Sequence, residues 1–115
     1  MLTICMEFRK GILFVRLKGH LNKKTISKLN KKVTSVIEKT GINNVVFNLE
    51  NLKSIDFKGI SSLLYIYEMC KKNNGKSLVC GNNDNIKYKL KKTRLLNYIY
   101  EIPEELSAIK ILNMR

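Results

Sequence analysis

The apolar residues of this chain change their spacing along the sequence, and this change most constrains the fold. Between residues 2 and 8 they alternate with polar residues, the pattern of a strand with one buried face. Over residues 24–39 they recur every three or four positions, the pattern of an amphipathic helix. A chain that switches repeatedly between these two periods is typical of an α/β domain in which strands and helices alternate.

The same pattern predicts the element order β-β-α-β-α-β-α-β-α. A turn at residues 9–11 joins the first strand to a second at 12–17, which favours an antiparallel hairpin. Residues 45–47 form a continuous apolar run, typical of a central strand covered on both faces. The other expected segments are a loop at 50–55, a helix from 56 to about 75, a strand at 77–80, a helix from 84, a strand at 98–100 and a helix from 103. The sequence therefore predicts a mixed sheet with an N-terminal antiparallel hairpin and four α-helices.

All four helices carry apolar residues that are expected to face the core. The periodicity identifies these residues by their spacing, and basic residues occupy the opposite side of the helix at 24–39 and of the helix from 84. The expected inward residues are Ile26, Leu29, Val33, Val36 and Ile37, then Ile60, Leu63, Leu64, Tyr67 and Cys70, then Ile86 and Leu90, and finally Leu106, Ile109 and Leu112.

Length and composition indicate one soluble domain. With 115 residues, 44% of them hydrophobic, the chain can bury one core, so residues 1–115 are interpreted as a single domain. Its apolar runs are shorter than the roughly 20 residues that cross a bilayer, and the N-terminus lacks a secretory signal pattern. We therefore expect a cytoplasmic protein without membrane insertion. Cys5, Cys70 and Cys80 form no CxxC pair, so we expect three buried reduced thiols.

The formal net charge of +13 is the largest departure from an average composition. It suggests nucleic acid, an anionic membrane surface or an acidic protein partner. Lys, Asn and Ile are all abundant here, which is typical of codon bias in an AT-rich genome. Such a bias would raise the net charge without any selected binding surface. The segment KYKLKKTR at 87–94 is dense in lysine, and Tyr88, Tyr98 and Tyr100 are of a type that stacks on bases, so a basic nucleic-acid-binding domain is an alternative. No RNP-like or helix-turn-helix pattern accompanies it, so this alternative stays open but less favoured.

Catalytic motifs are missing from the sequence. His20 is the only histidine, and no GxSxG, HExxH or GxxxxGK[ST] segment is present. The glycines lie singly at the ends of predicted elements, so they form no phosphate-binding loop. We therefore predict no enzyme activity, no catalytic residue, no metal site and no cofactor.

Two segments resemble a known family. LKGHLNKKT at 17–25 is similar to the family segment L-x-G-E-L-D-x-x-T, and VVFNLENLKSIDFKGISSLL at 45–64 resembles a strand-loop-helix segment centred on D-S-S-G-L. Together they resemble the STAS domain, in particular the SpoIIAA-like anti-sigma factor antagonists. The resemblance covers the whole chain, including LVCG at 78–81, and implies the same α/β fold.

The resemblance implies a function in transcription regulation. Members of the family bind an anti-sigma factor, typically a small serine kinase, and so free a sigma factor to direct RNA polymerase. Phosphorylation of the serine that follows the family's aspartate breaks that binding. In this chain Asp56 matches the aspartate and Gly59 the glycine, but Phe57 holds the acceptor position and Lys58 the next serine position. The resemblance therefore implies an antagonist without a phosphoacceptor, whose usual off-switch is lost.

The same resemblance implies a partner-binding surface. Phe57 is interpreted either as an exposed binding hot spot or as a ring folded back onto the core. Asn22 stands where the family has aspartate, in a loop that resembles part of the partner surface, and it is also a good N-cap for the following helix. Ser54, Ser61 and Ser62 are nearby hydroxyls at positions that differ from the acceptor. The predicted partner-binding residues are His20, Asn22, Asp56, Phe57, Lys58, Gly59 and Ser61.

Three hypotheses follow. The first is an antagonist that binds an anti-sigma factor of the serine-kinase type without phosphorylation control. The second is a STAS module in another assembly, such as a stress-signalling complex or a membrane transport machine. The third is the basic nucleic-acid binder. The first rests on both family segments and on Phe57.

Overall fold

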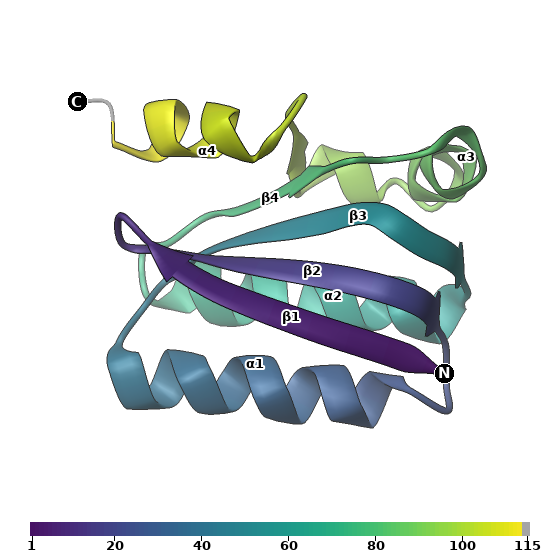
Figure 1. Cartoon of the computed structure of the whole chain (residues 1–115), viewed down its shortest axis with the longest axis horizontal. Helices are drawn as coiled ribbons and strands as arrows, with labels where there is room; N and C mark the ends of the chain where they lie inside the picture. Colours follow the sequence, from purple (N-terminus) through teal and green to yellow (C-terminus); the bar gives the residue numbers. More distant parts are fainter. Residues whose placement is uncertain (114–115) are drawn as a thin grey trace.

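The computed structural model describes residues 1–113, in which a β-hairpin is followed by alternating helices and strands (Figure 1). The sheet has the strand order β1-β2-β3-β4-β5, with β1 antiparallel to β2 and the other neighbours parallel. The predicted order, including the hairpin and the four α-helices, is confirmed. The bounds are β1 Leu2–Arg9, β2 Ile12–Leu21, α1 Ile26–Thr40, β3 Asn44–Ile55, α2 Phe57–Lys72, β4 Ser77–Cys80, α3 Asp84–Lys92, the short 3-10 helix η1 Leu95–Asn97, β5 Tyr100–Glu101 and α4 Glu105–Leu112.

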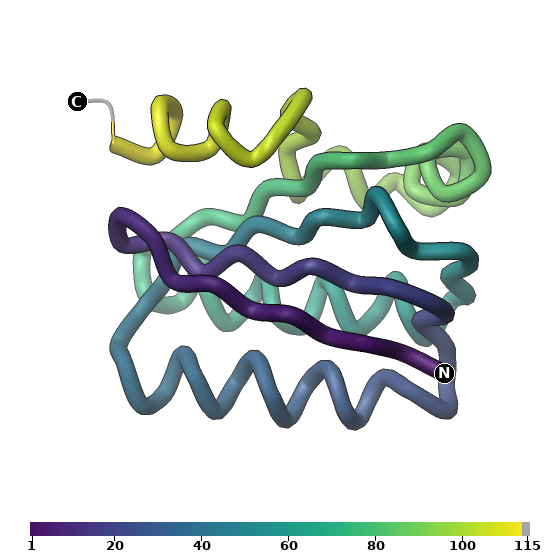
Figure 2. The backbone as a smooth tube through the Cα atoms, viewed as in Figure 1, coloured from purple at the N-terminus to yellow at the C-terminus, as the bar shows by residue number. Residues whose placement is uncertain are grey.

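Helices cover both faces of the sheet. Figures 1 and 2 show α1 and α2 along one face and α4 across the other. Because successive strand residues point to opposite faces, Leu13 and Val15 of β2 enter the core with α1 and α2, while Ile12 and Phe14 face α4. We call these the α1/α2 core and the α4 core. The α4 core is the smaller one and consists of Ile12, Phe14, Val46, Leu78, Cys80, Ile102 and Ala108.

Strand β3 is longer than the sequence pattern predicts. The expected loop at 50–55 is wrong, because β3 continues to Ile55 and pairs with β2 up to the register Leu21↔Ile55. Two register shifts give β3 extra residues opposite β2, the arrangement of a β-bulge. As a result Leu49, Leu52 and Ile55 are buried at a spacing of three, which hides the two-residue period of a strand. β2 likewise extends to Leu21, beyond the predicted end at residue 17.

The end of the chain also differs from the prediction. The strand at 98–100 is displaced, because Tyr98 ends η1 and only Tyr100 and Glu101 pair with β4. α4 begins at Glu105, so Pro103 precedes it. The predicted inward residue Leu106 is 57% exposed. The inward stripe instead starts at Glu105, which binds Arg16 of β2, and continues through Ala108, Ile109 and Leu112.

The two long helices follow the predicted periodicity more closely. Leu29, Val33 and Ile37 of α1 are buried as expected. The buried apolar stripe of α2 contains Ile66, which the prediction missed, while Leu64 and Tyr67 are half-buried at its edge. That buried stripe is Ile60, Leu63, Ile66 and Cys70.

All three cysteines are free thiols, but they are not all buried. Cys70 and Cys80 are buried as predicted, and burial raises the pKa of Cys70 and raises that of Cys80 to about 12. The prediction is wrong for Cys5, which is exposed because it alternates with Ile4 on the edge strand β1 and faces away from the α1/α2 core.

Candidate functional site

Two chain connections meet at the carboxyl ends of β2 and β3. β2 leads through residues 22–25 into α1, and β3 leads through Asp56 into α2. The two strands are parallel neighbours, so these connections lie at the same edge of the sheet. The backbone N–H of Asp56 donates to the carbonyl of Leu21 at 3.2 Å, which joins them directly. We call this region the β2/β3 corner.

Asp56 holds the β2/β3 corner together. It is the N-cap of α2, as predicted, and its Oδ1 accepts a hydrogen bond from the backbone N–H of Gly59 at 2.9 Å. Its Oδ2 accepts from the backbone N–H of Lys23 at 3.3 Å. One carboxylate therefore caps a helix and binds the neighbouring loop through its other oxygen.

Gly59 allows α2 to approach β2 closely. A Cβ atom at this position would lie 2.6 Å from the Leu21 carbonyl oxygen and 2.7 Å from a side-chain carbon of Ile55. Both distances are too short for real contacts, so any larger residue would push α2 outward. Gly59 is buried, so it shapes the corner without adding exposed surface.

Phe57 projects from this corner into solvent. Its side chain is 79% exposed, so the ring does not fold back onto the core. Lys58 and Ser61 are also exposed, and the first turn of α2 contains no acidic residue. Position 57 therefore presents an exposed phenyl ring without a hydroxyl, beside the positive charge of Lys58.

His20 and Asn22 lie on the β2 side of the corner. His20 Nδ1 is 2.6 Å from the hydroxyl of Ser54, and His20 is half-buried. The predicted capping role of Asn22 is wrong, because α1 starts at Ile26 with Thr25 at the N-cap. Asn22 instead stabilises the preceding turn, where its Oδ1 accepts from the backbone N–H of Lys24 at 2.9 Å.

The comparisons with known proteins identify the family. The model of the STAS domain matches residues 3–109. This chain belongs to the STAS domain family. This STAS domain is 30% identical over 82 residues to the anti-sigma F factor antagonist of Paenibacillus polymyxa. The alignment covers 71% of this chain and 70% of that protein. The family resemblance found in the sequence is thereby confirmed.

Solved structures share the fold of this STAS domain. An anti-sigma factor antagonist from Mycobacterium paratuberculosis matches with a TM-score of 0.87 at 18% identity, covering 99% of this chain and 96% of the other. The anti-sigma factor antagonist SpoIIAA in its unphosphorylated form matches with a TM-score of 0.79 at 13% identity, covering 97% and 100% of the two chains. The predicted mixed-sheet STAS fold is thus confirmed.

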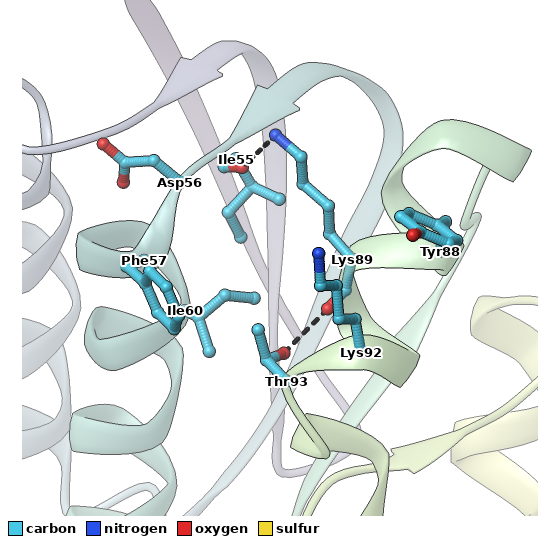
Figure 3. Close-up of a pocket in the computed structure, with 8 residues that line it drawn as sticks. All are labelled: Ile55, Asp56, Phe57, Ile60, Tyr88, Lys89, Lys92 and Thr93. Atoms are coloured by element: carbon cyan, nitrogen blue, oxygen red, sulfur yellow. Dashed lines mark hydrogen bonds between the residues drawn. The ribbon is translucent and has the colours of Figure 1, made fainter.

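A groove of about 330 Å³ adjoins the corner of this STAS domain (Figure 3). Phe57 and Ile60 of α2 line one side, and residues of α3 line the other. The sequence did not connect α3 with this site. Its basic segment at 87–94 was considered only as a candidate for nucleic-acid binding. The residues that line the groove are Ile55, Asp56, Phe57, Ile60, Tyr88, Lys89, Lys92 and Thr93.

Among residues 1–113, no group of three or more His, Cys, Asp or Glu side chains is arranged to hold a metal ion. In the same part of the chain, no helix combines the length and the apolar character needed to cross a bilayer.

Proposed function

We propose that this STAS domain is an anti-sigma factor antagonist, and that its β2/β3 corner binds an anti-sigma factor of the serine-kinase type. The 30% identity to an anti-sigma F factor antagonist supports this function. The observation that carries the proposed binding site is the exposed ring of Phe57 at the centre of the corner. Binding would release a sigma factor in the cytoplasm, so the protein would regulate transcription by association and not by catalysis.

The residue at position 57 determines how such binding is controlled. A phosphoserine in the first turn of α2 would add roughly two negative charges to the partner surface. Phe57 has no hydroxyl that can carry a phosphate, so binding at this corner is independent of phosphorylation at position 57. The amount of antagonist in the cell then sets how much anti-sigma factor is occupied.

The ring also contributes binding energy of its own. Burying a phenylalanine side chain is worth about 1.5–3 kcal/mol, and exposed aromatics are enriched among binding hot spots. Lys58 beside it provides a positive charge for an acidic partner. His20, Asn22 and Ser61 form the polar surroundings of the proposed contact.

The substitution Phe57→Asp tests this proposal. It removes the ring and adds a carboxylate at the position of the family's phosphoserine, so the affinity for the purified anti-sigma factor of the same organism should fall at least about tenfold. Isothermal titration calorimetry measures the change. Asp is well tolerated in the first turn of a helix, so the fold should be unaffected.

Tyr100→Asp is the matched control. Tyr100 is 71% exposed on β5, near Tyr67 and Lys71 in the last turns of α2, and therefore at the other end of that helix from Phe57. The Tyr100→Asp variant should bind the anti-sigma factor with the affinity of the wild type. Undiminished binding by Phe57→Asp would rule out the proposed contact. Failure of the wild type to bind any anti-sigma factor, with recovery of a transport protein instead, would support the alternative STAS assembly.

A further inference from the structure

We propose that the groove between α2 and α3 receives a large apolar side chain from an acidic segment of the protein partner. The walls are Phe57 and Tyr88, and Lys89 and Lys92 form the charged rim. This inference rests on the proposed function and adds α3 to the binding surface. It also names the chemistry of the partner segment, an apolar residue flanked by carboxylates.

The interior of the groove is suited to an apolar group. Ile55 and Ile60, which are buried, form its floor, while Phe57 is 79% and Tyr88 64% exposed. Figure 3 shows Ile55 between the two helices, with the two aromatic rings on opposite sides. Its volume of about 330 Å³ lies at the lower end of ligand pockets, which start at about 300 Å³. A side chain from a docked segment fits this size better than a large cofactor.

The polar atoms at the floor already have partners. The carbonyl oxygen of Ile55 accepts a hydrogen bond from Lys89 Nζ at 2.9 Å. The carboxylate of Asp56 accepts from two backbone N–H groups, and in Figure 3 it points away from the groove. These polar atoms are poorly suited to recognise a nucleobase, because base recognition depends on free hydrogen-bond donors and acceptors. These hydrogen bonds therefore favour an apolar occupant.

Two hydrogen bonds hold α3 beside β3 before any partner arrives. One is the bond from Lys89 to Ile55. In the other, Asn83 Nδ2 donates to the carbonyl of Leu52 at 3.1 Å. Ile86 and Leu90, on the inner side of α3, are fully buried. The groove is thus preformed, which reduces the entropy lost on binding.

The charge of the rim selects an acidic partner. Lys89 and Lys92 are exposed, and Lys92 Nζ lies 5.9 Å from the centre of the Tyr88 ring. Asp56 is the one acidic residue among the described lining residues, and its carboxylate is already hydrogen-bonded. A second copy of this chain would bring a net charge of +13 against the same rim, so self-association here is disfavoured.

The experiment measures the affinity of Tyr88→Ala and Lys92→Glu for the purified anti-sigma factor. Both residues are exposed, so both variants should fold, and thermal unfolding followed by circular dichroism checks this. Tyr88→Ala should weaken binding about tenfold, because it removes one wall. Lys92→Glu should weaken binding several-fold and reduce its dependence on salt, because it reverses a rim charge.

Lys91→Glu is the matched control for charge, since Lys91 is exposed on the same helix but does not line the groove. It should bind within about twofold of the wild type. If Phe57→Asp abolishes binding while Tyr88→Ala and Lys92→Glu bind normally, the groove proposal is wrong and the proposed function stands. If the wild type does not bind the anti-sigma factor, both fail. A groove-dependent dimer in gel filtration, or an RNA oligonucleotide whose binding Tyr88→Ala weakens, would also overturn the inference.

Discussion

The helices on the two faces of the sheet are attached to it by different forces. Under α1 and α2, the core is large and apolar, and it includes fully buried residues from both helices such as Val33 and Leu63. Under α4, a small apolar cluster is supplemented by a polar contact between Arg16 of β2 and Glu105 of α4. Hydrophobic burial thus dominates one face, whereas hydrogen bonds and charge contribute much of the attachment on the other.

The difference matters for the β2/β3 corner. Phe57 belongs to α2, and α2 is anchored in the α1/α2 core by Ile60, Leu63 and Ile66. α4 shares none of these contacts, because its buried residue Ala108 packs in the α4 core. The proposed partner surface should therefore depend on the first face and tolerate damage to the second.

Leu63→Ala should have the largest effect on stability. Leu63 is fully buried in the α1/α2 core, and truncating such a leucine costs about 2–5 kcal/mol of unfolding free energy. Urea unfolding followed by circular dichroism measures the loss. The variant should also lose partner binding at temperatures where the wild type still binds, because α2 carries the corner.

Ile109→Ala is the matched truncation on the other face. Ile109 is only partly buried against the α4 core, so the expected loss is about 1 kcal/mol, with unchanged partner binding at 25 °C. Equal losses from the two substitutions would contradict the contrast between the faces.

Arg16→Met should release α4 with a smaller loss of stability. Arg16 Nε and Nη2 donate to the two carboxylate oxygens of Glu105 at 2.9 and 2.7 Å, and Nη2 also donates to Glu7 at 2.8 Å. Since the Arg16 side chain is 39% exposed, solvent screening limits the expected loss to about 1–2 kcal/mol. Cys80, buried in the α4 core, should then react faster with a thiol reagent, while Cys70 stays protected.

Arg9→Met is the control for this experiment. Arg9 lies 3.9 Å from Glu7 in an exposed ion pair, which should contribute almost nothing to stability. Cys5 is exposed and should react quickly in every variant, so it serves as an internal standard. Faster labelling of Cys70 together with Cys80 in Arg16→Met would mean that both faces open as one unit.

Lowering the pH should reduce the contribution of Glu105 to the free energy of unfolding, by less than Arg16→Met does. Hydrogen bonds from Arg16, and secondarily from Asn48, lower the pKa of Glu105 below its ordinary value of 4.5, against the opposing effect of burial. The folded protein therefore favours the ionised form. The stabilisation is complete above pH 4.5 and is lost as the pH falls through the lowered pKa of the folded state.

Glu105→Gln provides the reference for this titration, because it cannot ionise. The wild type should be more stable than Glu105→Gln at about pH 7, and the gap between their urea midpoints should narrow as the pH is lowered below 4.5. A gap that stays constant with pH would show that the charge of Glu105 contributes nothing to the attachment of α4.

Local signals in the sequence predicted much of the fold. The hairpin, α1, α2 and the capping role of Asp56 depend on periodicity and residue chemistry within a few positions, so they could be identified without coordinates. The second half of β3 could not, because its bulges exist only through pairing with β2.

The candidate site likewise combines residues that local sequence signals predict with residues that only long-range contacts bring in. The family segments pointed to Asp56, Phe57 and Gly59, but an aromatic residue at the start of a helix can face either core or solvent, so its exposure had to come from the structure. The contribution of Tyr88 was not predictable, because α3 reaches the corner through hydrogen bonds from Lys89 and Asn83 to residues more than 30 positions away.

The hydrogen bonds of Asp56 that hold the corner together do not involve the exposed side chain at position 57. Its carboxylate joins α2 to the loop after β2 through backbone N–H groups alone, and these exist whatever side chain follows it. Position 57 can therefore exchange one side chain for another without rebuilding the frame beneath it.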